Sequence, residues 1–230
     1  MLPGEVERFS LAERTITDIV ERYGYQEIRQ PMLEFTSFFS RGLGEATDAV
    51  EKEMYTLHDR DGESLALRPE GTASSVRAVV DRNLLREGKP KLWYAGWMFR
   101  YERPQKGRYR QFYQIGAEAF GIPGPDVDAE LIEMAARMWR DLGIDEAVTL
   151  EINTIGSGVS RQTYRDALVH YLTPLADELD PDSRRRLETN PMRILDSKNE
   201  HTQSLLENAP DLHDYVDDDA RAHFDGLRRY

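Results

Sequence analysis

The sequence predicts an α+β fold, in which helices flank a mostly antiparallel sheet and a helical subdomain follows. Residues 92–100 and 110–120 alternate with period two on either side of a polar, basic loop, which indicates a β-hairpin. Residues 5–23 and 126–142 repeat their apolar side chains at helical spacing. From Gly156 onward, acidic residues and prolines break the chain into short helical segments. We therefore expect one domain over 1–155 and a helical subdomain over 156–230.

The elements of the first domain follow from local signals. The helix over 5–23 ends at Gly24, which suits a C-terminal cap. A strand over 28–33 contains Pro31, which a strand tolerates only at an edge or bulge. The remaining predictions are strands over 52–57 and 63–68, a helix over 73–84 capped by Thr72 with Val76, Val79 and Val80 inward, a helix over 126–142 capped by Asp126, and a strand over 147–153. In the second domain we expect helices over 160–172, 183–189, 200–208 and 217–229.

Composition restricts the classes of function. The chain has 230 residues and a net charge of −12, which argues against broad, nonspecific binding of nucleic acid. The basic residues in the loop at 103–110 nevertheless form a local cluster. No apolar run is long enough to span a bilayer, and no signal peptide is expected. The lack of cysteine excludes disulfides and thiolate metal sites and fits a cytoplasmic protein. The five histidines lack ligand-like spacing, so we expect no structural metal.

One face of the predicted hairpin carries unusual chemistry. Arg100, Gln114 and Glu118 fall on the same side as Gly96 and Gly116, and glycine in a strand often marks close approach of a ligand. A guanidinium group suits phosphate oxygens, whereas a carboxylate can hold an ammonium group. This pattern suits a site that joins an amino acid to a nucleotide. An ordinary hairpin with a solvated basic loop explains the same pattern equally well.

A second candidate position is the turn Arg68–Pro69–Glu70–Gly71–Thr72, between a predicted strand and a predicted helix. A carboxylate on such a turn is well placed to meet a ligand. The pattern alone favours a plain capping turn with an exposed glutamate.

Longer segments resemble one family. The segment FRYERPQKGRYRQFYQIGAEAFG at 99–121 is similar to motif 2 of class II aminoacyl-tRNA synthetases, in the form found in histidine–tRNA ligases. The segments RPEGTA at 68–73, DAVEKEMYTL at 48–57 and RRRLETNPMRILDSKN at 184–199 resemble the bacterial members of that family. The helix and proline-containing strand near the start resemble motif 1, which implies a homodimer. Phe35, Phe38 and Phe39 would add apolar surface there.

The resemblance implies that ATP and L-histidine form histidyl-adenylate and that the histidyl group then passes to tRNA(His). It implies a catalytic role for Arg100, at the α-phosphate and the attacking carboxylate. It places Arg108 and Glu102 beside ATP, with Mg²⁺ on the ATP phosphates. It further implies that histidine is bound by Glu70 and Thr72 at its ammonium group and by Gln114 and Glu118 at the floor of its pocket.

The chain also departs from the family pattern. Histidine–tRNA ligases continue with a segment that supplies a second catalytic arginine, then motif 3 and an anticodon-binding domain, and these 230 residues contain none of them. We therefore expect a truncated, N-terminal portion of the catalytic domain with an inserted helical subdomain, and little or no ligase activity from it alone. Two alternatives are a histidine-binding regulatory subunit of ATP phosphoribosyltransferase, which the intact motif 2 and the insertion disfavour, and a non-catalytic dimerisation or RNA-binding module.

Overall fold

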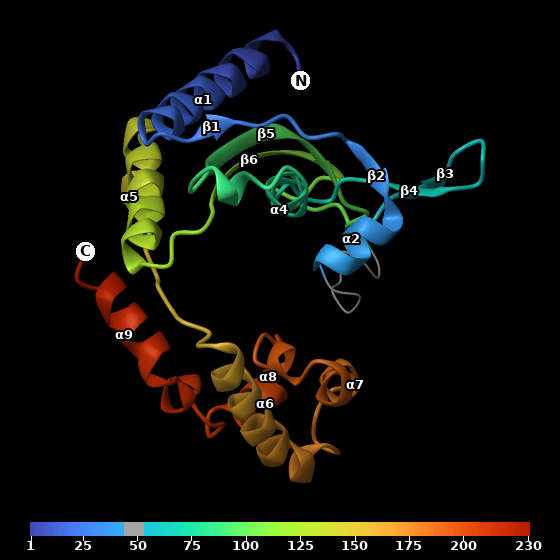
Figure 1. Ribbon diagram of the computed structural model, residues 1–230. Helices are drawn as coiled ribbons and strands as arrows, with labels where there is room; N and C mark the ends of the chain where they lie inside the picture. Colours follow the sequence, from blue (N-terminus) through green and yellow to red (C-terminus); the bar gives the residue numbers. More distant parts are fainter. Residues whose placement is uncertain (44–52) are drawn as a thin grey trace. The chain divides into compact units, whose positions relative to one another are not determined.

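The computed structural model describes residues 1–43 and 53–230, which divide into two compact units, Met1–Thr149 and Leu150–Tyr230 (Figure 1). The sequence predicted a domain boundary at 155. The segment DAVEKEMYTL begins at 48, so its residues up to 52 lie outside the described part of the chain, as does the start of the strand predicted over 52–57.

The first unit contains two small sheets and the helices that cover them. Its elements are α1 (Pro3–Arg22), β1 (Gln26–Glu27), β2 (Leu33–Phe35), α2 (Thr36–Leu43), β3 (Thr56–His58), β4 (Ser64–Leu67), α4 (Thr72–Asp81), η1 (Leu84–Arg86), β5 (Lys91–Phe99), β6 (Gln111–Ala119), α5 (Pro125–Asp141) and η2 (Asp145–Ala147). The strand orders are β1-β5-β6 and β2-β4-β3. Strand β1 runs parallel to β5, and the other strand pairs are antiparallel. The predicted α+β class with a mostly antiparallel sheet is confirmed.

The β5–β6 hairpin has the predicted strands and a continuous register from Lys91 opposite Ala119 to Phe99 opposite Gln111. Directly opposed residues of an antiparallel pair share a face. Figure 1 shows α1 above this hairpin and α4 below it. The core on the α1 side contains Ile19, Val20, Tyr25, Trp93 and Met134. The face toward α4 carries the polar side chains of Gln114 and Glu118 among buried Leu92, Tyr94 and Met98.

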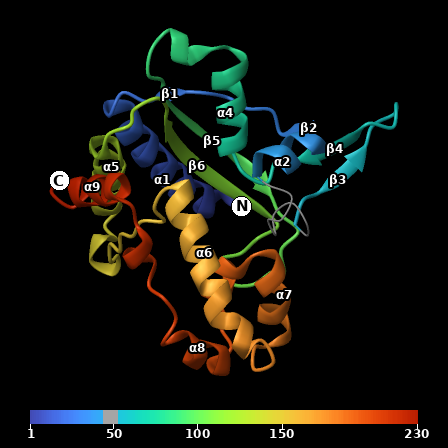
Figure 2. The ribbon, with the colours of Figure 1, turned by 60° about the horizontal axis from the view of Figure 1, so that its bottom comes forward.

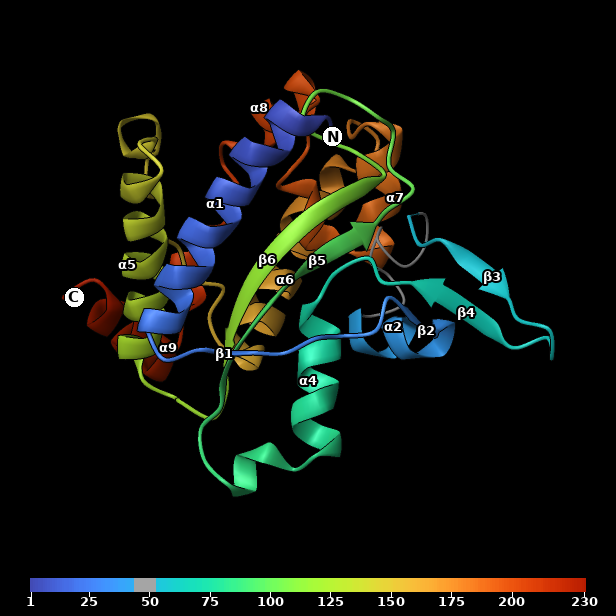
Figure 3. The same ribbon diagram turned by 90° about the horizontal axis from the view of Figure 1, so that it is seen from above.

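The second sheet packs against α2 and α4 through a smaller core of Phe39, Ala66 and Ala73. Figure 3 shows its three strands beside α2, at the opposite end of the unit from α5. Glu34 on β2 is 8% exposed and forms an ion pair with Arg77 on α4, whose guanidinium group also lies 4.7 Å from the Phe38 ring centroid. The pair thus ties the sheet to the helix.

Several local predictions were wrong. Only Val79 of the three valines on α4 is buried, and Val76 and Val80 are exposed, because Ser74 and Ser75 fill the inward positions of the first turns. The N-cap of α4 is Gly71, and that of α5 is Gly124. Thr72 and Asp126 therefore belong to the first helical turns instead of capping them.

Two predicted strands also differ. The strand over 28–33 is interrupted around Pro31, which cannot donate a ladder hydrogen bond, so β1 and β2 lie on either side of it. The strand predicted over 147–153 is not observed: Ala147 ends η2, and residues 148–153 pair with no strand in the described part of the chain. Alternation without a neighbouring strand leaves the backbone hydrogen bonds unformed.

The second unit is helical. Its elements are α6 (Gly158–Leu172), η3 (Thr173–Leu175), α7 (Pro181–Thr189), η4 (Pro191–Ile194), α8 (Glu200–Leu206), η5 (Leu212–Tyr215) and α9 (Asp218–Leu227). Figure 2 shows α7 beside α6. The buried core comprises Tyr164, Leu168, Leu172, Leu179 and Ile194. Its four α-helices all have a side-chain N-cap, namely Ser157, Asp180, Asn199 and Asp217. The helices predicted here are confirmed with small shifts at their ends.

Asp180 connects three parts of this unit. Its carboxylate accepts from the Ser183 backbone and hydroxyl groups on α7, from the Ser197 hydroxyl, and from Thr202 on α8 at 2.9 Å. These hydrogen bonds, that from the Ser183 hydroxyl foremost, lower the pKa of Asp180 to about 2.

Asp180→Ala is expected to lower the free energy of unfolding of the second unit by about 1 kcal/mol at neutral pH, the usual cost of a lost N-cap. Because the folded-state pKa of Asp180 lies below its unfolded value, its contribution is present above about pH 4 and is lost as the pH falls toward 2. Thermal unfolding followed by circular dichroism should therefore show a weaker acid dependence in the variant. Asp182→Asn, an exposed change two residues along in the first turn of α7, removes only an exposed ion pair with Arg185 and should alter the acid dependence much less. An equal effect of both substitutions would contradict this role of Asp180.

Candidate functional site

The site lies on the β5–β6 face that points away from α1. By register, this face presents Leu92 opposite Glu118, then Tyr94 opposite Gly116, then Gly96 opposite Gln114, and then Met98 opposite Phe112. We call this face, from the Leu92–Glu118 pair to Arg100, the hairpin floor. Arg100 follows directly after β5, and its backbone N–H bonds to the Arg110 carbonyl. The sequence had placed Arg100, Gln114 and Glu118 on one face, and the register agrees.

The turn from Arg68 to Thr72 covers this floor. The Phe99 backbone N–H donates to the Arg68 carbonyl at 3.0 Å, which fixes one end of the turn on β5. At the other end, the Tyr94 ring lies against two glycines. A Cβ at Gly71 would lie 2.2 Å from this ring, and one at Gly116 would lie 2.3 Å from it. Both positions therefore need glycine, since any larger residue would displace a ring that is 2% exposed.

Two carboxylates meet at the start of α4. The Glu70 carboxylate accepts from the backbone N–H groups of Thr72 at 2.6 Å and Ala73 at 2.8 Å. The Thr72 hydroxyl donates to Glu118 Oε1 at 2.7 Å, so one residue contacts both acids. Burial raises the pKa of Glu118, the nearby charge of Glu70 raises it further, and the Thr72 hydrogen bond partly opposes this. This end of the floor therefore favours a cationic ligand group.

Glu70 also caps the start of α4, as the sequence pattern alone predicted for this turn. Its two oxygens cap α4, where the helix dipole also favours negative charge. A carboxylate has about four acceptor positions, so capping leaves lone pairs and charge for a ligand. The residue is 9% exposed rather than freely solvated.

The opposite end of the floor is basic. Arg100 Nε donates to the Pro69 carbonyl at 2.8 Å, and its guanidinium group lies 5.1 Å from the Phe112 ring centroid. Glu102 lies between two arginines, 3.8 Å from Arg100 and 3.6 Å from Arg108. Both ion pairs are long, so the terminal nitrogens of Arg100 remain available to a phosphate, and the Arg108 side chain, 63% exposed, can turn toward one.

The predicted residues are thus arranged along one line. Glu70, Thr72 and Glu118 come together at one end, and Arg100, Glu102 and Arg108 come together at the other. The backbone of Arg100 lies eight residues along β5 from Leu92, the partner of Glu118, but its side chain reaches back toward the acids, since Nε donates to the carbonyl of Pro69, the residue before Glu70. Gln114 lies between the two ends, and its buried Oε1 has no hydrogen-bond partner among the described residues. The floor can therefore accept a ligand with a cationic group beside Glu70 and Glu118 and an anionic group beside Arg100.

Sequence reasoning missed three residues of this arrangement. Arg68 is 5% exposed and lies over Gly96, Tyr94 supports the turn, and Gln30 donates to the Gly71 carbonyl and to the Ser75 hydroxyl. The glycines at 71, 96 and 116 were the available signal. Each marks a place where a large side chain from elsewhere comes close, but the sequence does not say which one.

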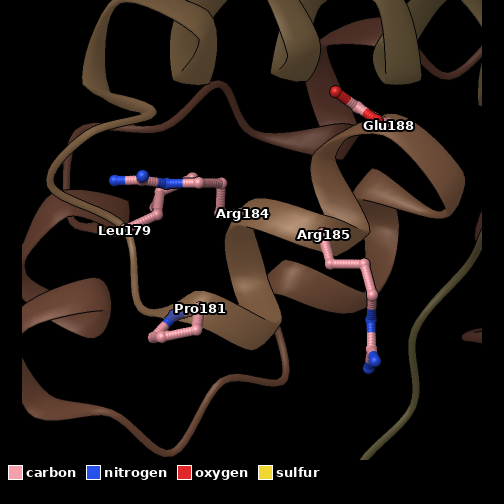
Figure 4. Close-up of a pocket in the computed structure, with 5 residues that line it drawn as sticks. All are labelled: Leu179, Pro181, Arg184, Arg185 and Glu188. Atoms are coloured by element: carbon pink, nitrogen blue, oxygen red, sulfur yellow. The ribbon is translucent and has the colours of Figure 1, made fainter.

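Other features of the described chain lack this chemistry. A surface hollow of about 390 Å³ in the second unit is lined by Leu179, Pro181, Arg184, Arg185 and Glu188 (Figure 4). Figure 4 shows Arg184 and Arg185 pointing different ways, and Arg184 already donates to two backbone carbonyls. Across residues 1–43 and 53–230, no group of His, Cys, Asp and Glu side chains is arranged to hold a metal ion. Over the same ranges no helix combines the length and apolarity needed to cross a membrane.

An antiparallel hairpin covered by a strand–turn–helix, acidic at one end and basic at the other, is the arrangement of a class II aminoacyl-tRNA synthetase. The model of the histidyl-tRNA synthetase family matches residues 1–167, and the chain belongs to this family. A histidine–tRNA ligase of Marinomonas sp. (strain MWYL1) is 57% identical over 99% of the chain, which covers 54% of that relative. The chain thus spans about half the length of this curated relative.

Solved structures agree on the fold. The apo histidyl-tRNA synthetase of S. aureus superimposes with a TM-score of 0.76 and 33% identity over 100% of this chain and 51% of that one. An ATP phosphoribosyltransferase regulatory subunit/histidyl-tRNA synthetase from Bacillus halodurans C superimposes with a TM-score of 0.59 and 18% identity, over 100% and 62% of the two chains. The second likeness concerns the fold alone.

Proposed function

We propose that this chain binds histidine and ATP for the formation of histidyl-adenylate, the first step of a histidine–tRNA ligase reaction, and that the parent reaction continues to tRNA(His). The observation that carries the proposal is the order of charges along the hairpin floor. The α-carbon of histidine carries both the cationic ammonium group and the carboxylate, the imidazole ring lies one methylene group away, and ATP adds further anionic oxygens beyond the carboxylate. A floor that runs from Glu118 to Arg100 matches that order of charges.

Each residue then has a role. Glu70 and Thr72 bind the ammonium group, and Gln114 and Glu118 form the floor of the imidazole pocket. Arg100 is the catalytic residue: it contacts the α-phosphate and the attacking carboxylate, and it neutralises the charge that develops between two anions. Holding both reactants in line supplies a further part of the rate enhancement.

The ATP end requires more than Arg100. Glu102 and Arg108 bind ATP, and Mg²⁺ enters with the ATP phosphates, because Mg²⁺ commonly binds through substrate phosphates with few protein ligands. In this proposal the first unit acts as part of the catalytic domain and the second as an inserted helical subdomain. The cytoplasm is the proposed location, with which the lack of cysteine is consistent.

The regulatory-subunit alternative is the weaker one. Its structural relative is 18% identical, against 33% and 57% for the two synthetases. A non-catalytic dimerisation or RNA-binding module is the other alternative, and measuring the binding of histidine and ATP separates it from the proposed function.

Glu118→Gln is expected to weaken binding of L-histidine to this chain by about tenfold or more, because a charged acceptor in a half-buried site is lost. Titration calorimetry measures the dissociation constants directly. Glu87→Gln, which removes an exposed carboxylate just after η1, should leave histidine binding unchanged. Equal affinities of the native chain and Glu118→Gln would argue against this pocket, and a native chain that binds neither histidine nor ATP would favour the non-catalytic module.

We further propose a homodimer through the motif 1 region. The outer face of the β2-β4-β3 sheet leaves Leu33, Phe35 and Leu57 exposed, and the register brings Phe35 and Leu57 to the same residue of β4, Leu65. Contiguous exposed apolar residues of this kind mark interaction surfaces. Phe35→Asp should shift the chain toward monomer in sedimentation velocity, whereas Val159→Asp in the second unit should not. A native chain that sediments as a monomer at all concentrations would contradict the proposal.

A further inference from the structure

Arg68 is a buried cation that the proposed reaction does not yet use. Its side chain is held in a fork: Nε donates to the Trp97 carbonyl on β5, and Nη1 donates to the Gln30 carbonyl between β1 and β2, both at 2.9 Å. These acceptors are neutral. Among the residues that the structure describes, no carboxylate forms an ion pair with Arg68. Burial accordingly lowers the pKa of this guanidinium group.

A buried charge without an opposite charge is costly, so the position favours an anion. The two carbonyl partners of Arg68 hold its guanidinium group in one orientation. The third nitrogen, Nη2, lies against the floor: a Cβ added at Gly96 would be 2.1 Å from it. The absence of a side chain at Gly96 thus lets the charge approach the hairpin.

The register places this charge midway along the floor. Gly96 lies four residues along β5 from Leu92, the partner of Glu118, and four residues before Arg100. Gln114 lies opposite Gly96, and its buried Oε1 has no partner among the described residues. The middle of the floor therefore offers a cation and an unused acceptor side by side.

We propose that Arg68 is a positioning residue for the carboxylate end of histidine: clamped by Gln30 and Trp97 over Gly96, its guanidinium group places a positive charge between the acids that hold the cationic end and Arg100. This inference rests on the proposed function and deepens it. When the imidazole ring lies at Glu118 and the ammonium group at Glu70, the carboxylate, which shares the α-carbon with the ammonium group, can face Arg68. Arg68 then favours the orientation in which that carboxylate reaches the phosphate held by Arg100.

The test compares two ligands. Histidinol keeps the ammonium group and the imidazole ring of histidine but has no carboxylate. Arg68→Gln removes the charge, and Arg68→Lys keeps a charge without the fork. Gly96→Ala leaves Arg68 in the chain and forces Nη2 off the floor, which makes it informative even if Arg68→Gln fails to fold. Gly88→Ala is the matched control, because a Cβ there meets nothing within 4 Å.

Calorimetry on the 230-residue chain gives the dissociation constants of both ligands for each variant, and circular dichroism confirms folding. We expect Arg68→Gln and Gly96→Ala to raise the dissociation constant for histidine by about tenfold. The dissociation constant for histidinol should change by less than about threefold. Arg68→Lys should recover part of the histidine affinity, and Gly88→Ala should match the native chain.

Each other result overturns the inference. An equal loss for histidine and histidinol would show that Arg68 only supports the fold. No change for either ligand would show that its charge does not reach the carboxylate. In both of these cases binding by the native chain would leave the proposed function standing. A native chain that binds neither ligand would contradict the proposed function and, with it, this role of Arg68.

Discussion

Arg100→Ala is expected to weaken binding of a non-hydrolysable histidyl-adenylate analogue by about 3–4 kcal/mol, a loss on the order of 100-fold or more. The guanidinium group is preorganised for this task, since Nε is fixed by the Pro69 carbonyl and the plane rests against Phe112. Its partner Glu102 is 3.8 Å away, which leaves the terminal nitrogens available to an anion. Titration calorimetry with a sulfamoyl analogue measures the change.

A neighbouring arginine provides the control for net charge. Arg103→Ala removes one positive charge from the same basic loop, at an exposed position three residues farther along. This substitution should weaken binding of the analogue only slightly, because exposed charges are screened by solvent and salt. Similar losses for Arg100→Ala and Arg103→Ala would mean that the loop attracts anions generally and that Arg100 has no specific contact.

Arg77→Ala is expected to lower the free energy of unfolding of the first unit by about 3 kcal/mol, toward the lower end of the range for a broken buried ion pair because Arg77 is partly exposed. The guanidinium group makes two hydrogen bonds to Glu34, one of them 2.6 Å long, and also lies over the Phe38 ring. Removing it leaves the Glu34 carboxylate buried without its cation. Chemical denaturation followed by tryptophan fluorescence reports the change.

The double variant Arg77→Ala/Glu34→Ala separates this mechanism from simple loss of contacts. It should be less destabilised than Arg77→Ala alone, because no buried charge remains. Arg29→Ala breaks an exposed pair with Glu27 and should change stability little. If the double variant were less stable than the single one, the penalty would come from packing instead of from the unpaired carboxylate.

Much of the hairpin was predictable, because alternation with period two specifies which side chains share a face. Arg100, Gln114 and Glu118 were placed together on that ground alone, and the register from Lys91 to Phe99 agrees. The helices of the second unit were also predictable, since Asp180 and Asp217 are strong N-caps before short apolar repeats.

What could not be predicted depends on contacts between distant segments. In the sequence, Arg68 is an ordinary arginine at the end of a strand. Its hydrogen bonds to the Gln30 and Trp97 carbonyls depend on segments that are distant in the chain. Val80 fits a buried helical stripe by spacing but is 65% exposed, because nothing that the structure describes covers it. Apolar and polar side chains alternate over residues 148–153, as they do in a strand. A strand also requires a partner strand, and the alternation does not show whether one is present.

The most direct test of this account is a crystal structure of the 230-residue chain with the non-hydrolysable histidyl-adenylate analogue. The account predicts that the analogue lies on the hairpin floor, with its imidazole ring at Glu118, its linking group near Arg68 and Arg100, and its adenosine beside Glu102. An analogue bound on another surface, or one that lies on the floor with its adenosine at Glu118, would contradict it.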